Sequence, residues 1–280
     1  MKFYNLAKLF SSKEMTQIAE NNWSLIEKLG QEFGLLHTPK KLSEFFDEAY
    51  SLLLNNYRNE YVIKNEIANK ILIGRHSLNT STMLTEVTVG DNIADCLIIN
   101  GESTCYEIKT EFDSLSRLHE QLNSYTKVFE NTYVVAPKKH LKALYKIHCD
   151  CPKFGIIELT EKNRLSLKIK SPKSNYLDKN LMFNILRKPE YVSIAESIYG
   201  PLPNIPNTQI YGFCEKIFQG LSLKQANSSF KNSLKKYRKN DLLLIESLPR
   251  SMTNAAISYN LSRKNKSSIS EKMQYTIQNH

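Results

Sequence analysis

The stretch ADCLIINGESTCYEIKTEFD, residues 94–113, has the pattern of two short apolar strands joined at Asn100-Gly101. Asn-Gly between two apolar runs is a strong signal for a β-hairpin. Three charged residues nevertheless lie on these strands, namely Asp95, Glu107 and Lys109. Because an unpaired charge is costly to bury, the three charges indicate a functional site on the predicted sheet.

The length of the hairpin loop decides whether these charges meet. Glu107 and Lys109 leave the same face of a strand because they are two residues apart. A two-residue Asn-Gly turn would put Asp95 and Glu107 on opposite faces of the sheet. A three-residue loop, Asn-Gly-Glu, would pair Ile99 with Ser103 and set Asp95 directly across from Glu107. If the carboxylates act together, the sequence predicts the longer loop.

Two carboxylates beside a lysine have a defined chemistry. Opposed residues of two strands lie about 5 Å apart, a spacing that suits an oxygen-preferring divalent cation such as Mg²⁺ or Mn²⁺. Such a metal polarises a phosphoryl oxygen and generates hydroxide, while Lys109 orients water or stabilises developing negative charge. Phosphodiester hydrolysis is the reaction that fits best. The alternative is that Lys109 only neutralises Glu107 at a strand end and that Asp95 faces solvent.

The predicted helix before the sheet carries another acidic residue in an unexpected place. At 100° per residue, an apolar arc is formed by Val62, Ile63, Ile67 and Ile71, and Glu66 falls inside it. Glu66 is therefore a candidate metal ligand. The alternative is an internal ion pair with Lys70, four residues further along the helix.

The predicted helix after the sheet has a polar border. Gln121 and Tyr125 lie one turn apart at the edge of its apolar stripe, and Arg117 extends the same side by another turn. Beside the hairpin, this edge can face a phosphate backbone, to which Gln and Tyr donate hydrogen bonds and Arg offers a fork. The alternative is an ordinary amphipathic helix with polar border residues.

The remaining pattern predicts a mixed α/β domain between two helical segments. Its expected elements are, in order, a helix over 59–73, a strand over 83–89, the hairpin, a helix over 114–129 capped by Asp113, a strand over 132–136, a helix over 138–147, and strands over 154–159 and 164–170. The loop GPLPNIPNT at 200–208 is the clearest boundary because it holds three of the nine prolines. Two or three helices are expected beyond it. The predicted domains are a helical N-terminal extension over 1–56, the α/β domain over 57–199 and a basic helical region over 200–280.

The charge balance favours an anionic partner. The 280 residues carry a net charge of +10, and from residue 200 onward 12 basic residues stand against 4 acidic ones. Four of the basic residues cluster near the end of one predicted helix: Lys235, Lys236, Arg238 and Lys239. They are expected to contact a nucleic-acid backbone. The alternative is a solvated helix face, and a helix-turn-helix around residues 221–240 cannot be told from an ordinary helical pair by spacing alone.

Targeting signals and cysteines indicate the cellular context. The longest apolar runs are far shorter than the roughly 20 residues of a membrane helix, so no membrane partner is expected. The start MKFYNLAKLFSSKE has no sustained apolar region, and we expect a cytoplasmic location. The five cysteines form a scattered, odd set rather than a disulfide framework. HCDC at 148–151 has no second ligand pair at zinc spacing, so reduced thiols are favoured over a zinc site.

These residues resemble the PD-(D/E)xK nuclease superfamily, whose fold is an αβββαβ core. After Glu66 on the first helix, the matching motifs are IAD with Asp95, YEIK with Glu107 and Lys109, and QLNSY with Gln121 and Tyr125. They occur in the order that the superfamily uses. The likeness runs from about Glu66 to Tyr191 and is strongest to a branch of small bacterial and phage members.

The resemblance implies a restriction-endonuclease-like core with a mixed sheet and helical N- and C-terminal extensions. It implies Asp95, Glu107 and Glu66 as metal ligands and Lys109 as the catalytic lysine. Gln121 and Tyr125 would shape the site. One position departs from the branch, since Ile93 stands where an Arg is frequent. Glu86 matches an acidic position of the branch for which a structural contact is as plausible as a functional one.

The expected function is therefore that of a Mg²⁺- or Mn²⁺-dependent nuclease, with DNA favoured over RNA as its substrate. One alternative is a catalytically inactive nucleic-acid-binding or assembly module on the same fold. Another is an RNase effector, because the same metal site can cleave either polymer. The choice between endonuclease and exonuclease, and the existence of an oligomer or a protein partner, stay open at this point.

Overall fold

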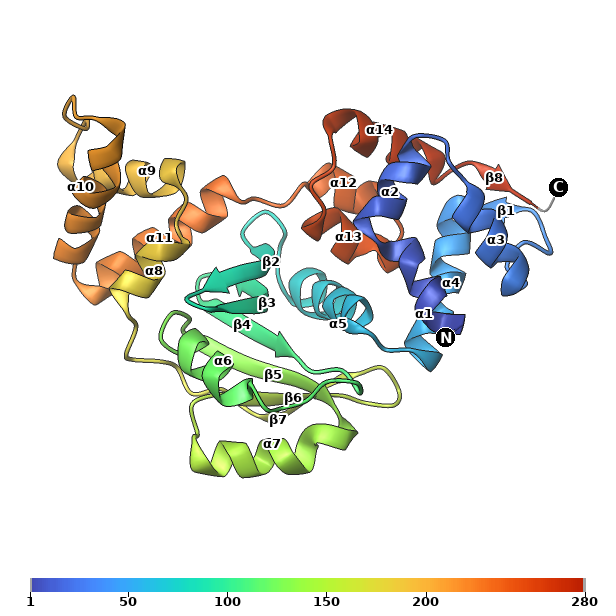
Figure 1. Ribbon diagram of the computed structural model, residues 1–280, viewed down its shortest axis with the longest axis horizontal. Helices are drawn as coiled ribbons and strands as arrows, with labels where there is room; N and C mark the ends of the chain where they lie inside the picture. The colour runs from blue at the N-terminus through green and yellow to red at the C-terminus, as the bar shows by residue number, and fades with distance from the viewer. Residues whose placement is uncertain (1, 279–280) are drawn as a thin grey trace. The chain divides into compact units, whose positions relative to one another are not determined.

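The computed structural model describes residues 2–278, and the chain divides into two compact units. The first unit combines Met1–Arg75 with Asp241–His280, and the second is the continuous segment His76–Asn240. The predicted segments 1–56, 57–199 and 200–280 have different bounds, because the two ends of the chain share one unit. Figure 1 shows the elements of each unit in colours that run along the chain.

The first unit is helical. Its elements are α1 (Lys2–Ala7), η1 (Lys8–Phe10), α2 (Ser12–Ala19), α3 (Ser24–Glu32), α4 (Leu42–Asn56), α5 (Glu60–Ile67), the π-helical turn η2 (Ala68–Ile73), α12 (Leu242–Ser247), η3 (Arg250–Met252), α13 (Thr253–Ser258), α14 (Arg263–Lys272), and the short strands β1 (Lys40–Lys41) and β8 (Thr276–Ile277). The antiparallel pair β1–β8 joins its N-terminal and C-terminal parts. Asn65 does the same, since its amide donates to the carbonyl of Arg250 and accepts from the backbone N–H of Asn254.

The second unit is built on a six-stranded mixed sheet. The strands are β2 (Thr82–Val89), β3 (Asn92–Ile99), β4 (Ser103–Ile108), β5 (Asn131–Pro137), β6 (Gly155–Leu159) and β7 (Leu165–Ile169), and they lie side by side in chain order. The pairs β4–β5 and β5–β6 are parallel, and the other neighbours are antiparallel. The mixed α/β class expected from the sequence is confirmed, and the six expected strands follow one another along the chain as predicted.

The hairpin has the predicted register. Ile99 pairs with Ser103, so the loop between β3 and β4 contains three residues. The backbone N–H of Asn100 donates to the carbonyl of Glu102 at 3.1 Å. Gly101 has φ of +108°, a conformation that residues with a Cβ rarely adopt. The Asn-Gly-Glu sequence therefore supplies the glycine that the longer loop requires.

The helix after the hairpin is shorter than predicted. It is α6 (Leu118–Tyr125) rather than a helix over 114–129 capped by Asp113. Asp113 instead accepts hydrogen bonds from the backbone and hydroxyl of Thr110, at 2.7 and 2.6 Å, and so closes a turn directly after β4. Asp and Ser side chains compete with helix formation in this way. Together with α7 (Lys138–Asp150), α6 packs its Leu118 and Leu122 on β5 and β6.

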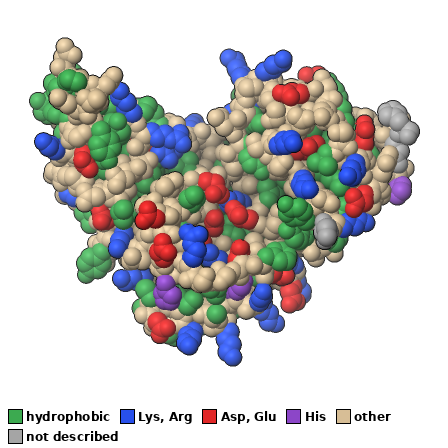
Figure 2. Space-filling model, viewed as in Figure 1, with side chains coloured by type: hydrophobic (Ala, Val, Ile, Leu, Met, Phe, Trp, Pro, Cys, Tyr) green, Lys and Arg blue, Asp and Glu red, His purple; other side chains and the backbone are tan. Residues whose placement is uncertain are grey.

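A second helical layer packs on β2, β3 and β4. It consists of α8 (Lys179–Ile185), α9 (Lys188–Tyr199), α10 (Asn207–Gly220) and α11 (Leu223–Tyr237), whose apolar side chains share one core with these strands. The proline-rich loop at 200–208 therefore joins two helices of the same unit. Residues 179–240 contain ten Lys and Arg against three Asp and Glu. Most of the net positive charge of +10 therefore lies in this segment, and Figure 2 shows blue side chains at the upper left, where the layer lies.

The start and the end of the second unit lie together. The side-chain amide of Asn240 accepts from the backbone N–H of Met83 and donates to its carbonyl, both at 2.8 Å. The hydroxyl of Thr82 donates to the carbonyl of Arg238 at 3.0 Å. The first strand of the sheet, β2, is therefore hydrogen bonded to Asn240, the last residue of the unit.

The C-terminal third contains more helices than the two or three expected beyond residue 208. Five α-helices, α10 to α14, lie there. Two of these, α12 and α13, have six residues each and are too short to show a helical period in the sequence. Among residues 2–278, no helix combines the length and the apolar character that crossing a membrane requires.

Candidate catalytic carboxylate–lysine site

Asp95 lies where the β3–β4 ladder ends. The last backbone pair is Cys96 with Tyr106, and continuing the same register sets Asp95 opposite Glu107. The carboxylate Oδ2 of Asp95 accepts a hydrogen bond of 2.6 Å from the backbone N–H of Ile108. A charge-assisted hydrogen bond of this length is strong, and it fixes the carboxylate beside the next strand. Asp95 is partly exposed, so its carboxylate can still reach a ligand.

Glu107 and Lys109 form a buried pair. Their side chains lie on one face of β4, with Lys109 Nζ at 2.7 Å from Glu107 Oε1. Lys109 Nζ also donates to Gln121 Oε1 of α6 at 2.8 Å. Glu107 is 1% exposed, and its second oxygen, Oε2, is buried with no hydrogen-bond partner among the residues that the structure describes. A buried carboxylate oxygen of this kind is costly unless a cation or a donor completes it.

The environment of Glu107 also affects its protonation and that of Tyr125. Burial raises the pKa of Glu107, and the charge of Lys109 offsets part of this effect. Tyr125 is fully buried, and its hydroxyl donates to the carbonyl of Ile93 at 2.7 Å. Burial, together with the negative charge of Glu107, raises the pKa of Tyr125. Tyr125 therefore stays a neutral hydrogen-bond donor that fixes the start of β3 against α6.

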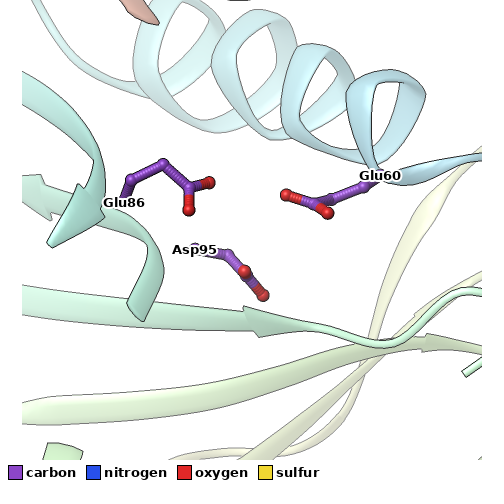
Figure 3. Close-up of side chains that lie close together, drawn as sticks. All are labelled: Glu60, Glu86 and Asp95. Atoms are coloured by element: carbon purple, nitrogen blue, oxygen red, sulfur yellow. The ribbon is translucent and has the colours of Figure 1, made fainter. Parts of the chain in front are cut away.

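The structure draws attention to Glu86, to which sequence reasoning gave no definite role. The β2–β3 register pairs Thr85 with Cys96 and Val87 with Ala94, so Glu86 stands opposite Asp95. Carboxylate oxygens of the two residues come within 4.8 Å of each other, and Figure 3 shows both side chains on neighbouring strands. Glu86 has φ of +54° in the middle of a strand, a strained conformation for a residue with a Cβ. The position of Glu86 opposite Asp95 follows from the β2–β3 register, which sequence reasoning did not predict.

Three carboxylates thus occupy matching positions on three consecutive strands. Glu86 on β2, Asp95 on β3 and Glu107 on β4 follow one another across the sheet by strand register. Like charges on opposed positions repel one another. Of these three, Glu86 and Asp95 have carboxylate oxygens within 4.8 Å of each other, and Glu107 does not belong to that group of acidic residues.

Glu66 has its contacts in the first unit. The hydroxyl of Tyr50 donates to its Oε1 at 2.7 Å, and its Oε2 forms an ion pair with Lys70. Both oxygens are therefore engaged within that unit, which favours the internal pair weighed as the alternative from the sequence. Glu60, also labelled in Figure 3, belongs to the first unit as well and pairs there with Lys64. The metal role expected for Glu66 stays a prediction.

The residues expected to bind nucleic acid differ in their availability. Arg117 is exposed directly before α6, and Lys236 and Lys239 are exposed near the end of α11. Lys235 is partly exposed. Arg238 is different, because its guanidinium makes two hydrogen bonds to Glu190, at 2.6 and 2.7 Å, and a third to the carbonyl of Ile185. The guanidinium of Arg238 is therefore engaged by an ion pair within the second unit.

The fold and the site define a mixed α/β protein with a buried carboxylate–lysine pair on its central strands. Residues 54–262 match the family Bacteriophage P4 protein cII, and the chain belongs to this family. One relative, Protein cII of Enterobacteria phage P4, is 35% identical over 89 residues. The aligned segment is 31% of this chain and 33% of the relative, so the chain spans about a third of the length of the curated relative it matches. No solved structure matches the chain.

Proposed function

We propose that the second unit is a divalent-metal-dependent nuclease with a restriction-endonuclease-like core, as the PD-(D/E)xK resemblance implies. The observation that carries the proposal is the buried oxygen Glu107 Oε2. It forms no hydrogen bond within 3.5 Å with the described residues, although the side chains of Tyr125 and Gln121 lie close enough to lower the pKa of Glu107, while Oε1 of the same carboxylate contacts Lys109. A structural ion pair alone does not explain why a second oxygen is left buried and unpaired.

The residues present fit Mg²⁺ or Mn²⁺. Both ions prefer carboxylate oxygens, and in our proposal Asp95 and Glu107 supply them, with Glu86 as a third acidic group. Such an ion supplies Lewis-acid stabilisation of a phosphoryl oxygen and a more acidic water. The raised pKa of Glu107 agrees with a carboxylate that is stabilised as an anion only when a cation is close.

The protein residues around the carboxylates have distinct tasks in this proposal. Lys109 is held between Glu107 and Gln121, so its three ammonium protons point along fixed directions. It orients the attacking water and stabilises the negative charge that develops on the phosphate. Gln121 is a positioning residue because it acts through Lys109. Tyr125 positions β3, and therefore Asp95, through the carbonyl of Ile93.

DNA is the proposed substrate, and the helical layer α8–α11 is the proposed backbone contact. Its ten basic and three acidic residues give it a charge of +7, and Lys235, Lys236 and Lys239 are available at its surface. A lysine-rich surface binds phosphates irrespective of base sequence. Arg117, exposed at the start of α6, is the proposed phosphate contact nearest in sequence to the catalytic lysine.

The test is a cleavage assay on linear, circular and single-stranded DNA and on RNA, with Mg²⁺, Mn²⁺ or EDTA. Cleavage is expected only with metal, and Lys109→Ala is expected to lower the rate by at least about 1000-fold, since it removes a charged group at the reacting phosphate. Lys146→Ala, an exposed lysine of α7 in the same unit, is the matched control. Cleavage in EDTA, or an equal rate for Lys109→Ala, would contradict the mechanism.

The second candidate function is a nucleic-acid-binding module without turnover. The observation that favours it is the positive helical layer, which requires no catalysis. Binding of DNA by the wild-type protein with no cleavage of any substrate in either metal would support this candidate. Cleavage of RNA alone would instead support the ribonuclease alternative.

A further inference from the structure

The second unit contains a hollow outside the carboxylate–lysine site. Its volume is about 680 Å³, and it is lined by the end of α6, the loop before α8, Pro152 with Lys153, and Leu223 of α11. Small-molecule sites in proteins fall in the range of about 300–1,000 Å³. The hollow is therefore large enough for one nucleotide.

The walls of the hollow are held by the fold. The loop before α8 is tied to the turn after α6 by two backbone contacts, since Ser174 N–H donates to the carbonyl of Glu130 at 2.7 Å and Asp178 N–H to the carbonyl of Lys127 at 2.6 Å. The hydroxyl of Ser174 donates to the carbonyl of Thr126 at 2.7 Å. A wall that is already ordered binds a ligand at a smaller entropic cost.

The lining combines an aromatic ring with positive charge. Tyr176 is 88% exposed, which is the highest value among the large hydrophobic residues at the surface of the described part of the chain. Lys127 and Lys153 are exposed, and their ammonium groups form no hydrogen bond or ion pair with other residues in the range 2–278. Two other charged residues that line the hollow have partners in the protein. Lys173 forms ion pairs with Glu102 and Glu130, and the side chain of Asp178 caps α8. The remaining charge is positive.

We propose that this hollow binds one unpaired nucleotide of a nucleic-acid strand, with the base stacked on Tyr176 and the phosphate beside Lys127 and Lys153. Every base has a π-face, so stacking on an exposed tyrosine accepts any sequence. The side-chain amides of Asn123 and Asn175 line the same hollow and can hydrogen bond the edge of the base. A base within a duplex cannot enter a hollow without leaving its stack. The expected ligand is therefore single-stranded.

This proposal rests on the proposed function, because it names the kind of substrate strand that the nuclease would bind. Binding of the strand in the hollow itself requires no metal. One helix links the two places: α6 presents Gln121 to Lys109, and Asn123 of the same helix lines the hollow. Two residues along a helix correspond to about 200°, so the two side chains leave α6 on opposite sides. A nucleotide held in the hollow would thereby fix a strand against the helix that positions the catalytic lysine.

The experiment measures binding in EDTA, where no metal-dependent cleavage occurs. Fluorescein-labelled 12-nucleotide single strands and the matching duplex are titrated by anisotropy with the wild type, Tyr176→Ala, Tyr176→Phe and the double variant Lys127→Ala/Lys153→Ala. Tyr145→Ala and Lys142→Ala on α7 are matched exposed controls. Cleavage is measured separately with Mg²⁺, so a protein that binds the single strand in EDTA but cleaves no substrate contradicts the proposed function and not the proposal for the hollow.

Tyr176→Ala is expected to weaken single-strand binding about tenfold, while Tyr176→Phe keeps it. The double lysine variant is expected to weaken it too and to reduce the salt slope by about 1. Duplex binding and both controls should not change. Equal single-strand binding by Tyr176→Ala and the wild type, or an equal loss on the duplex, would overturn the proposal. If the mononucleotide dAMP binds in a Tyr176-dependent way and the oligonucleotide does not, the strand is the wrong ligand.

Discussion

The backbone N–H of Ile108 donates a 2.6 Å hydrogen bond to the carboxylate of Asp95, across the point where the β3–β4 ladder stops. An amide that would otherwise pair with the neighbouring strand is thus bound by a side chain. The bond separates two tasks of Asp95. The oxygen Oδ2 closes the hairpin, and in our proposal the negative charge contributes to binding a cation.

Two substitutions at Asp95 separate these tasks. Asp95→Asn keeps an acceptor for Ile108 but removes the charge, so we expect a change of less than about 1 kcal/mol in the free energy of unfolding. Mn²⁺ affinity should fall by on the order of 100-fold. Asp95→Ala removes the acceptor as well and should destabilise the protein by about 2 kcal/mol. Urea unfolding and Mn²⁺ titration test both variants, and equal stability of the two variants would show that the hydrogen bond is not formed.

Glu86 allows backbone strain to be separated from charge. Its φ of +54° costs a residue with a Cβ roughly 1–2 kcal/mol, whereas glycine adopts it readily. Both Glu86→Ala and Glu86→Gly remove the carboxylate, and we expect both to weaken Mn²⁺ binding. Glu86→Gly should be more stable than Glu86→Ala by about 1 kcal/mol in thermal unfolding. Unchanged metal affinity in both variants would remove Glu86 from the proposed site.

Glu130 gives the protein a predictable pH dependence. Burial by itself raises the pKa of Glu130, but hydrogen bonds from Lys231, the backbone N–H of Ser103 and Lys173 together outweigh burial and lower the pKa below 4.5. A lowered pKa means that the charged form stabilises the fold above pH 4.5 and that this stability is lost as the pH falls through the lowered pKa.

Glu130→Gln tests this dependence. At pH 7 the variant should lose about 3 kcal/mol of unfolding free energy, because it leaves Lys231 partly buried without its carboxylate. The difference from the wild type should shrink once the pH is below the lowered pKa. Urea unfolding at pH 7, 5 and 3 measures it. Glu120→Gln, an exposed glutamate on α6, is the control, and a constant difference at all three pH values would contradict the assignment.

We expect Arg238 to contribute to the stability of the fold and the neighbouring lysines to contribute to DNA binding. Arg238→Ala leaves Glu190 buried without its partner, so we expect a loss of about 3 kcal/mol in unfolding free energy. Lys235→Ala and Lys239→Ala should leave stability within about 0.5 kcal/mol and should each reduce the salt slope of duplex DNA binding by about 1. Binding isotherms at several salt concentrations, together with thermal unfolding, distinguish the two groups. A salt slope unaffected by the lysine variants would leave the layer as a solvated face.

The hairpin was the part of the fold that local chemistry could define. The Asn-Gly-Glu loop and the period of two along a strand are local properties, and they were enough to predict the Ile99–Ser103 register. The same strand period placed Glu107 beside Lys109, whereas the contact of Lys109 with Gln121 was not predicted from these local properties. The start of that helix was wrong because Asp113 closes a turn with Thr110, a competition that helical periodicity does not reveal.

Long-range pairing could not be predicted from local pattern. The position of Glu86 opposite Asp95 depends on the β2–β3 register, and the pairing of Arg238 with Glu190 joins residues 48 positions apart. The composition of the first unit is a further example, because Asn65 is held by Arg250 and Asn254 through backbone atoms. Backbone groups carry no residue identity, so such contacts have no signature in a single sequence.

The second unit is inserted in the sequence between the two segments of the first unit, and this has a consequence for synthesis on the ribosome. His76–Asn240 is complete as soon as Asn240 emerges and closes on Met83, and it can fold at that moment as one continuous unit. Met1–Arg75, although made first, lacks the chain from Asp241 onward that completes its unit. Asn65 therefore acquires its partners Arg250 and Asn254 only after the second unit has been synthesised. We therefore expect the second unit to complete its fold before the first, although the first unit begins earlier in the chain.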